Sequence, residues 1–168
     1  KGNEVARKNL VSNYDQRGIK MNKQSISNFV KISNELRIKE EYKESMALAC
    51  IAFASCSRNK YPNHSDKKRF VQLLKDNFSQ YCSIGLPGIS ASTIMIFVEE
   101  ENKHITHITY EEMIYKYVRC NLIHQAELPS IKFSKEVVIA DYNADTKLPI
   151  TMIDMLNQIT LNYLNSYD

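Results

Sequence analysis

Hydrophobic positions recur mostly every three or four residues along this chain, which is the spacing of one buried face on an α-helix. The pattern predicts helices over residues 24–36 and 39–57, from near residue 66, over 109–128, and from residue 151. Within the second helix, residues 46–54 are apolar on nearly every side, so we expect this helix to be central and buried. The same apolar stretch is too short to span a membrane.

Two segments depart from the helical spacing. Residues 93–98 are rich in β-branched side chains, which favours a strand, but the flanking serines and acidic residues suit a short helix over 90–108, which we prefer. Residues 136–140 have the composition of a strand and 143–146 that of a turn leading into 148–150, which predicts a small β-hairpin. The expected fold is therefore mainly α: a bundle of four to five helices with a small β-hairpin appendage.

Composition adds a few bounds to this picture. The chain has 168 residues, of which 43% are hydrophobic and 24% charged, and this suits one globular domain over residues 21–168. Residues 1–20 form an N-terminal arm that is flexible or lies upstream of a natural start at Met21. The net charge of +3 permits contact with nucleic acid without requiring it. With no signal peptide and four cysteines that fit free thiols, we expect a cytoplasmic protein without a cofactor.

The helix predicted from residue 109 carries the most suggestive chemistry. Thr109 and Glu112 have the spacing of a capping box, which marks the helix start, and Arg119 and His124 follow. Arginine is a permanent cation that binds phosphate, and histidine exchanges a proton near neutral pH; metal-free RNA cleavage uses both. Plainer roles stay open, with Arg119 as a solvated helix residue and His124 as a charge favoured by the helix C-terminus.

The spacing of Arg119 and His124 also bears on assembly. Five residues turn an ideal α-helix by about 140°, so the two side chains do not lie one above the other. One such helix makes a poor pocket from them. We therefore expect a symmetric homodimer, in which two copies of the helix place both Arg/His pairs around one phosphodiester.

Residues 115–129, Tyr-Lys-Tyr-Val-Arg-Cys-Asn-Leu-Ile-His-Gln-Ala-Glu-Leu-Pro, resemble the signature of the HEPN superfamily (higher eukaryotes and prokaryotes nucleotide-binding). In that signature an Arg is followed, after four to six residues, by a His near the end of a bundle helix. The small-residue run at 52–57 and the basic segment at 68–71 also resemble bacterial HEPN proteins, so the resemblance covers roughly residues 40–165.

The resemblance implies a HEPN-like helical domain acting as a metal-independent endoribonuclease of the toxin or phage-defence type, silenced in some cases by an antitoxin or another regulatory protein. It implies that His124 takes the proton from a ribose 2′-hydroxyl, which then attacks the adjacent phosphorus. Arg119 would hold the phosphate and stabilise its growing charge. The implied partner is RNA.

Two positions depart from the HEPN pattern. Cys120 follows the Arg where members often carry a polar residue, and residues 55–57 are Ser-Cys-Ser where many members carry an acidic residue. Asn121 is therefore our candidate for a third catalytic residue, as an amide that orients the substrate. The departures keep a second function open: a catalytically inactive HEPN-like module that binds RNA, nucleotide or a protein partner.

A further set of basic or polar residues is predicted to contact RNA. They lie on the helix that carries Arg119 and His124 and at the start of the helix from residue 66. These residues are Lys116, Cys120, Gln125, Lys67, Lys68 and Arg69. A solvated helix start also explains the last three. His104 and His107 have no second ligand pair at zinc spacing, so we expect no metal site and place them on the surface.

Overall fold

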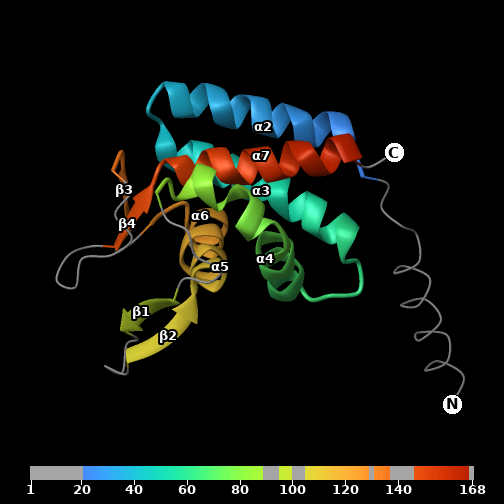
Figure 1. Ribbon diagram of the computed structural model, residues 1–168. Helices are drawn as coiled ribbons and strands as arrows, with labels where there is room; N and C mark the ends of the chain where they lie inside the picture. The colour runs from blue at the N-terminus through green and yellow to red at the C-terminus, as the bar shows by residue number, and fades with distance from the viewer. Residues whose placement is uncertain (1–20, 89–94, 100–104, 129–130, 137–145, 167–168) are drawn as a thin grey trace, which may run out of the picture.

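The computed structural model describes residues 21–88, 95–99, 105–128, 131–136 and 146–166 of the chain (Figure 1). Within this part the long helices form a bundle and three short helical segments follow one another without a break. The long helices are α2 (Lys23–Ile38), α3 (Tyr42–Lys60), α4 (Asp66–Gly85) and α7 (Thr151–Ser166), and the short segments are α5 (Tyr110–Met113), η1 (Ile114–Arg119) and α6 (Cys120–Gln125). The predicted mainly α helical bundle is confirmed. The arm expected at 1–20 lies outside the described residues.

Helix α3 occupies the centre of the bundle, as its apolar sequence predicts. It packs against α2, α4 and α7, and Met46, Ala49, Cys50 and Phe53 on it have no exposed surface. The Phe53 ring packs against the Phe70 ring of α4 in an edge-on arrangement, with 4.7 Å between the ring centroids. Burial of such side chains is the dominant favourable contribution to folding.

The boundary between α2 and α3 lies slightly later than predicted. We expected the second helix from residue 39, but Glu40 adopts a left-handed backbone conformation with φ of 65°. That conformation ends α2, and α3 begins at Tyr42. The helix then runs to Lys60, beyond the predicted end at residue 57.

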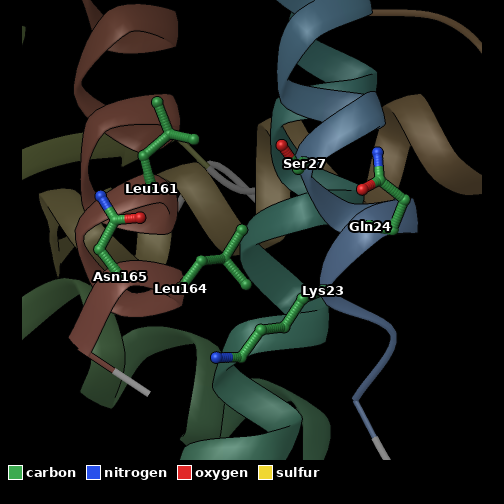
Figure 2. Close-up of a pocket in the computed structure, with 6 residues that line it drawn as sticks. All are labelled: Lys23, Gln24, Ser27, Leu161, Leu164 and Asn165. Atoms are coloured by element: carbon green, nitrogen blue, oxygen red, sulfur yellow. The ribbon is translucent and has the colours of Figure 1, made fainter. Parts of the chain in front are cut away.

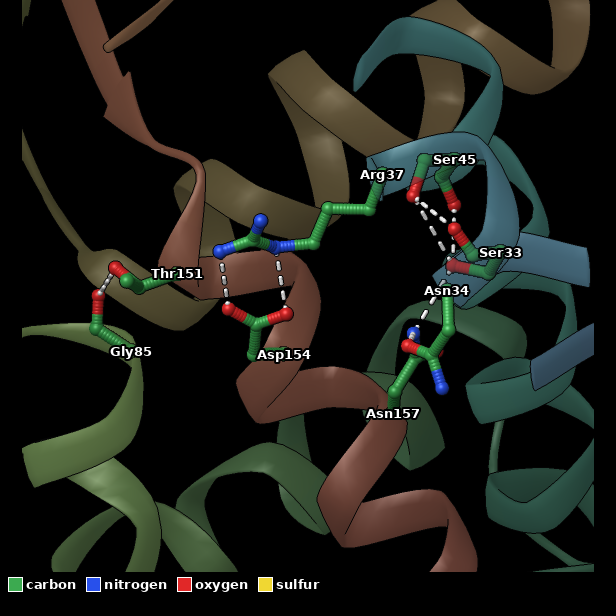
Figure 3. Close-up of polar contacts among 8 residues, drawn as sticks. All are labelled: Ser33, Asn34, Arg37, Ser45, Gly85, Thr151, Asp154 and Asn157. Carbon is green, nitrogen blue, oxygen red and sulfur yellow. Dashed lines mark hydrogen bonds and ion pairs between the residues drawn. The ribbon is translucent and has the colours of Figure 1, made fainter. Parts of the chain in front are cut away.

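A buried polar network joins α2, α3 and α7 (Figure 3). The Ser33 hydroxyl donates to the carbonyl oxygen of Ser45 at 2.9 Å, and the Ser45 hydroxyl donates to the carbonyl oxygen of Ser33 at 2.7 Å. The Asn157 amide of α7 donates to Ser33 Oγ at 3.0 Å. At the rim of this region, Arg37 donates through Nη2 to Asp154 Oδ2 at 2.7 Å. These contacts set how the three helices are aligned, because buried polar groups are costly unless they are paired.

The start of α7 is tied to the end of α4. Helix α7 begins at Thr151, as predicted. The Thr151 hydroxyl donates to the Gly85 carbonyl oxygen at 2.7 Å (Figure 3). An added Cβ at position 85 would lie 2.7 Å from Met155 Sδ, so a side chain there would require the Met155 side chain to shift.

An antiparallel strand pair precedes the helix that carries Arg119. Strand β1 (Met95–Glu99) pairs with β2 (Ile105–Thr109), with Met95 opposite Thr109. The helix preferred over residues 90–108 is therefore wrong wherever the structure describes that segment; 90–94 and 100–104 lie outside the described residues. The β-branched residues of both segments decide the outcome, since such side chains pack well on a pleated surface.

A second strand pair precedes α7, but it is not the predicted hairpin. Strand β3 (Ile131–Ser134) pairs with β4 (Thr146–Pro149) in parallel, with Ile131 opposite Thr146. A parallel partner cannot follow through a tight turn, so the partner of β4 lies earlier in the chain than we predicted. Of the predicted strand at 136–140, the structure describes only Glu136, which lies just after β3; 137–140 lie outside the described residues.

All four cysteines are described, and all are free thiols, as predicted. Cys50, Cys56 and Cys82 are buried, and Cys120 is half-buried. Burial raises the pKa of Cys50 and of Cys56 to about 12. No helix in the described part of the chain is long and apolar enough to cross a membrane.

Candidate functional site

The predicted capping box starts the helix that carries Arg119. The Thr109 hydroxyl accepts from the Glu112 backbone N–H at 3.3 Å, and the Glu112 carboxylate accepts from the Thr109 backbone N–H in return. Ile114, Val118 and Leu122 then follow at intervals of four and are buried. This apolar stripe holds the helix against the bundle and decides which of its residues face α4 and which face solvent.

The middle of this helix is wound as a π-helix, which the sequence did not predict. Segment η1 covers Ile114–Arg119, and the Cys120 backbone N–H donates to the Tyr115 carbonyl oxygen five residues earlier. Single turns of this kind occur frequently at functional sites. From Cys120 to Gln125 the helix is α-helical, so the step from Arg119 to His124 still turns by about 140°.

Arg119 faces α4 and binds its first residue. Arg119 Nη2 lies 2.8 Å from Asp66 Oδ2, and Arg69 Nη2 lies 2.7 Å from Asp66 Oδ1. The Tyr115 hydroxyl donates to Asp66 Oδ2 at 3.0 Å, and the Tyr115 ring centroid lies 5.3 Å from Arg119 Cζ. We call these four residues, Asp66, Arg69, Tyr115 and Arg119, the Asp66 cluster.

Burial and charge set the protonation states in the Asp66 cluster. Burial alone would raise the pKa of Asp66, but the hydrogen bonds from Arg69 and Tyr115 and the charge of Arg119 outweigh it and lower that pKa. Burial and donation to Asp66 raise the pKa of Tyr115 to about 12. Burial acts to lower the pKa of Arg119, but the contact with the Cys120 thiol and the charge of Asp66 outweigh it and raise that pKa. The cluster therefore holds two permanent cations and one carboxylate.

Asp66 is the member that sequence analysis missed. At 55–57 on α3, where the resembled pattern has an acidic residue, the Ser55 and Ser57 hydroxyls donate to the carbonyl oxygens of Ile51 and Ala54 in the same helix. The signals at Asp66 were local. Ser65, directly before it, caps α4, and Arg69 lies three positions after Asp66. Nothing local indicates a contact with Arg119, which lies far along the chain.

His124 lies apart from the Asp66 cluster. It is near the end of α6 and is exposed, as are Ile123 and Gln125 beside it. Arg119, by contrast, keeps only 16% of its side chain exposed. The two residues thus point to different surroundings within one copy of the chain, as their angular separation predicts.

The other residues predicted on this helix take part in local contacts. The Asn121 amide donates to the Tyr117 carbonyl oxygen at 2.9 Å, and Cys120 Sγ accepts from Arg119 Nη1 at 3.8 Å. Lys116 is exposed, with its ammonium 5.0 Å from the Tyr117 ring centroid. Asn121 is therefore bound to its own helix through its amide nitrogen, whereas Cys120 contacts Arg119 directly.

The predicted basic cluster at the start of α4 divides into three different environments. Arg69 joins the Asp66 cluster, with 13% of its side chain exposed. Lys67 forms an ion pair with Glu112 at 2.8 Å, which links α4 to the start of α5. Lys68 is exposed, and no polar contact of its side chain is found within the described residues. Of these three residues, only Arg69 contacts the carboxylate that Arg119 also contacts.

A pocket and a metal site are the two other kinds of binding site to consider in the described structure. A pocket lies between the first turns of α2 and the end of α7, lined by Lys23, Gln24, Ser27, Leu161, Leu164 and Asn165 (Figure 2). It contains none of the predicted site residues. Among the described residues, no three His, Cys, Asp or Glu side chains are grouped so that they could hold a metal ion. His107 is exposed on β2, and His104 lies outside the described residues.

Fold and site together define a mainly α bundle protein with an arginine-rich cluster at the contact between α4 and η1. The chain belongs to the Rv1289 family, whose sequence model matches residues 25–161. The matched range includes the Asp66 cluster and His124. No curated protein and no solved structure matches the chain.

Proposed function

We propose that this protein is a metal-independent endoribonuclease of the HEPN type, with Arg119 and His124 as its catalytic pair. The observation that carries the proposal is the state of Arg119. Its guanidinium lies 2.8 Å from Asp66 and beside the Tyr115 ring, so a permanent cation is held in one place. A preorganised cation is what stabilises the charge that develops on a phosphorane-like transition state.

The roles follow from the chemistry of the two side chains. Neutral His124 takes the proton of a ribose 2′-hydroxyl, and the oxygen forms a bond to the adjacent phosphorus as the bond to the 5′-oxygen breaks. An imidazolium donates a proton to that leaving oxygen. The products carry a 2′,3′-cyclic phosphate and a 5′-hydroxyl, and DNA is not cleaved because it lacks the nucleophile. Asn121 keeps a carbonyl oxygen to orient the substrate.

The active form in this proposal is a homodimer. Arg119 packs on α4 while His124 is exposed, so a second copy is needed to bring a His to each Arg. Ile123, next to His124, keeps 38% of its surface exposed and would lie in this contact between copies. Lys116 and Gln125 are exposed on the same helix and would contact the RNA.

The biological setting that we propose is a toxin or phage-defence ribonuclease acting inside the cell, controlled by an antitoxin or another regulatory protein. An RNA-cleaving enzyme without a metal or cofactor requirement would be active once its dimer forms. A partner that restrains this activity would protect cellular RNA, and this is why we add a regulatory protein to RNA as the expected partners.

A second candidate is a HEPN-like module that binds RNA, nucleotide or a protein partner without cleaving it. Two observations favour it: the Arg119 guanidinium already contacts Asp66 and Cys120, and the Asn121 amide nitrogen is bound to its own helix. In this alternative Arg119 retains its affinity for phosphate, and His124 has no chemical role.

Cleavage of RNA in EDTA separates the two candidates. Wild type, His124→Ala and, as a matched control, His107→Ala are incubated with total RNA and tRNA, and the product ends are analysed. His107 is an exposed histidine on β2 and is not one of the residues assigned to the site. We expect cyclic phosphate ends from wild type and His107→Ala and a loss of at least roughly a hundredfold in rate for His124→Ala. Equal cleavage by all three, or none, would reject the ribonuclease.

A further inference from the structure

The Asp66 cluster has an excess of positive charge in a partly buried place. Arg69 and Arg119 keep only 13% and 16% of their side chains exposed, and both contact the single carboxylate of Asp66. The Glu112 carboxylate of α5 is already paired with another cation, Lys67. One of the two guanidinium charges is therefore not balanced by a carboxylate within the described contacts.

The hydrogen-bonding capacity of the two guanidinium groups is also only partly used. Each guanidinium has five N–H donors. Arg69 donates through Nη2 to Asp66, while its Nε is buried and has no acceptor. Arg119 contacts Asp66 through Nη2 and Cys120 through Nη1. Donors that are withdrawn from water and left unpaired are costly, so the cluster is suited to an additional acceptor that carries negative charge.

Phosphate is the anion whose shape fits two adjacent guanidinium groups, because its oxygens accept several N–H donors at once. We propose that Arg69 and Arg119 together bind one phosphoryl group, with Asp66 as the positioning residue that holds both guanidinium groups side by side. This inference rests on the proposed function in one respect: Arg119 is the residue already assigned to the scissile phosphate. It adds Arg69 as a second phosphate ligand on a different helix.

Asp66 is suited to positioning because it is itself fixed. It is the first residue of α4, directly after the Ser65 cap, and the Tyr115 hydroxyl donates to the same oxygen that contacts Arg119. The carboxylate thus links the start of α4 to η1. Without it, two like charges would repel each other and move apart, and a phosphate would have to draw both into place on binding.

The test measures binding of inorganic phosphate by titration calorimetry at constant ionic strength, without RNA. The variants are Arg69→Gln and Arg119→Gln, with Lys75→Gln as the matched control because Lys75 is an exposed lysine further along the same helix, α4. We expect wild type to bind phosphate saturably at one site per chain. Each arginine variant should lose at least roughly tenfold in affinity, which is the contribution of one charged hydrogen-bonding group, and Lys75→Gln should stay within about twofold.

Arg69→Lys covers the case in which Arg69→Gln fails to fold, as judged from circular dichroism. Lysine keeps the charge but lacks the planar fork, so its affinity for phosphate should lie between those of wild type and Arg119→Gln. Absence of saturable binding to wild type, unchanged affinity in Arg69→Gln, or an equal loss in Lys75→Gln would overturn the proposal. Because phosphate binding needs no chemistry, Arg69-dependent binding without RNA cleavage would reject the ribonuclease and leave the phosphate site standing.

Discussion

Replacing Asp66 with Asn removes the carboxylate that joins α4 to η1 and leaves the rest of the side chain in place. Removing one partner of a fully buried ion pair costs about 3–5 kcal/mol of stability, and loss of an exposed pair costs about 1 kcal/mol or less. Asp66 keeps 36% of its side chain exposed, but its two arginine partners keep only 13% and 16%. We therefore expect Asp66→Asn to lower the free energy of unfolding by about 2 kcal/mol at pH 7.

The pH dependence of this loss follows from the direction of the pKa shift. The pKa of Asp66 is lower in the folded protein than its ordinary value, which is about 3.9 in an unfolded chain. The carboxylate then stabilises the fold fully above that ordinary value, and the stabilisation disappears as the pH falls through the lower, folded pKa. The difference between wild type and Asp66→Asn should be constant from pH 7 to pH 5 and should shrink below about pH 4.

Urea unfolding at pH 7, 5 and 3, followed by circular dichroism, measures both effects. The matched control is Glu35→Gln, because Glu35 faces Lys31 in an ion pair whose side chains are 55% and 76% exposed. The control should change the free energy of unfolding by less than about 0.5 kcal/mol at any of these pH values. The reasoning is refuted if Asp66→Asn behaves like the control at pH 7, or if its deficit is unchanged at pH 3.

Two further predictions test other parts of the structure. Ser45→Ala should lower the free energy of unfolding by about 1–3 kcal/mol, since it removes a buried hydroxyl that donates to Ser33 at 2.7 Å; a change below about 0.5 kcal/mol in urea unfolding would show that this bond contributes little. Iodoacetamide at pH 8 should modify Cys120 well before Cys50 and Cys56, because burial raises the pKa of those two thiols to about 12. Peptide mass spectrometry over time gives the order, and early labelling of Cys50 would contradict the buried core.

The apolar pattern determined the helical bundle by itself. The first helix was predicted over 24–36 and forms as Lys23–Ile38, and the start of α4 at Asp66 was predicted directly. The cap at Thr109 was also predicted correctly. These features are local: hydrophobic spacing and caps depend on residues within a few positions of each other, so the sequence displays them openly.

The tertiary structure decided the features that depend on distant partners. Strand β1 was predicted as helix because its pairing with β2 carries the stabilisation that its own sequence leaves ambiguous. The parallel pairing of β3 with β4 joins segments that a turn cannot connect.

The same division applies to the candidate site. The sequence placed Arg119 and His124 on one helix and predicted their divergence from the helical turn alone. The ion pair between Arg119 and Asp66 could not be predicted, because it exists only where the packing of η1 against α4 brings their side chains together. Packing also turned Arg69 toward that carboxylate and left Lys68 in solvent. The residues of the site are in the sequence, but which of them form ion pairs with one another is decided by the packing of the folded bundle.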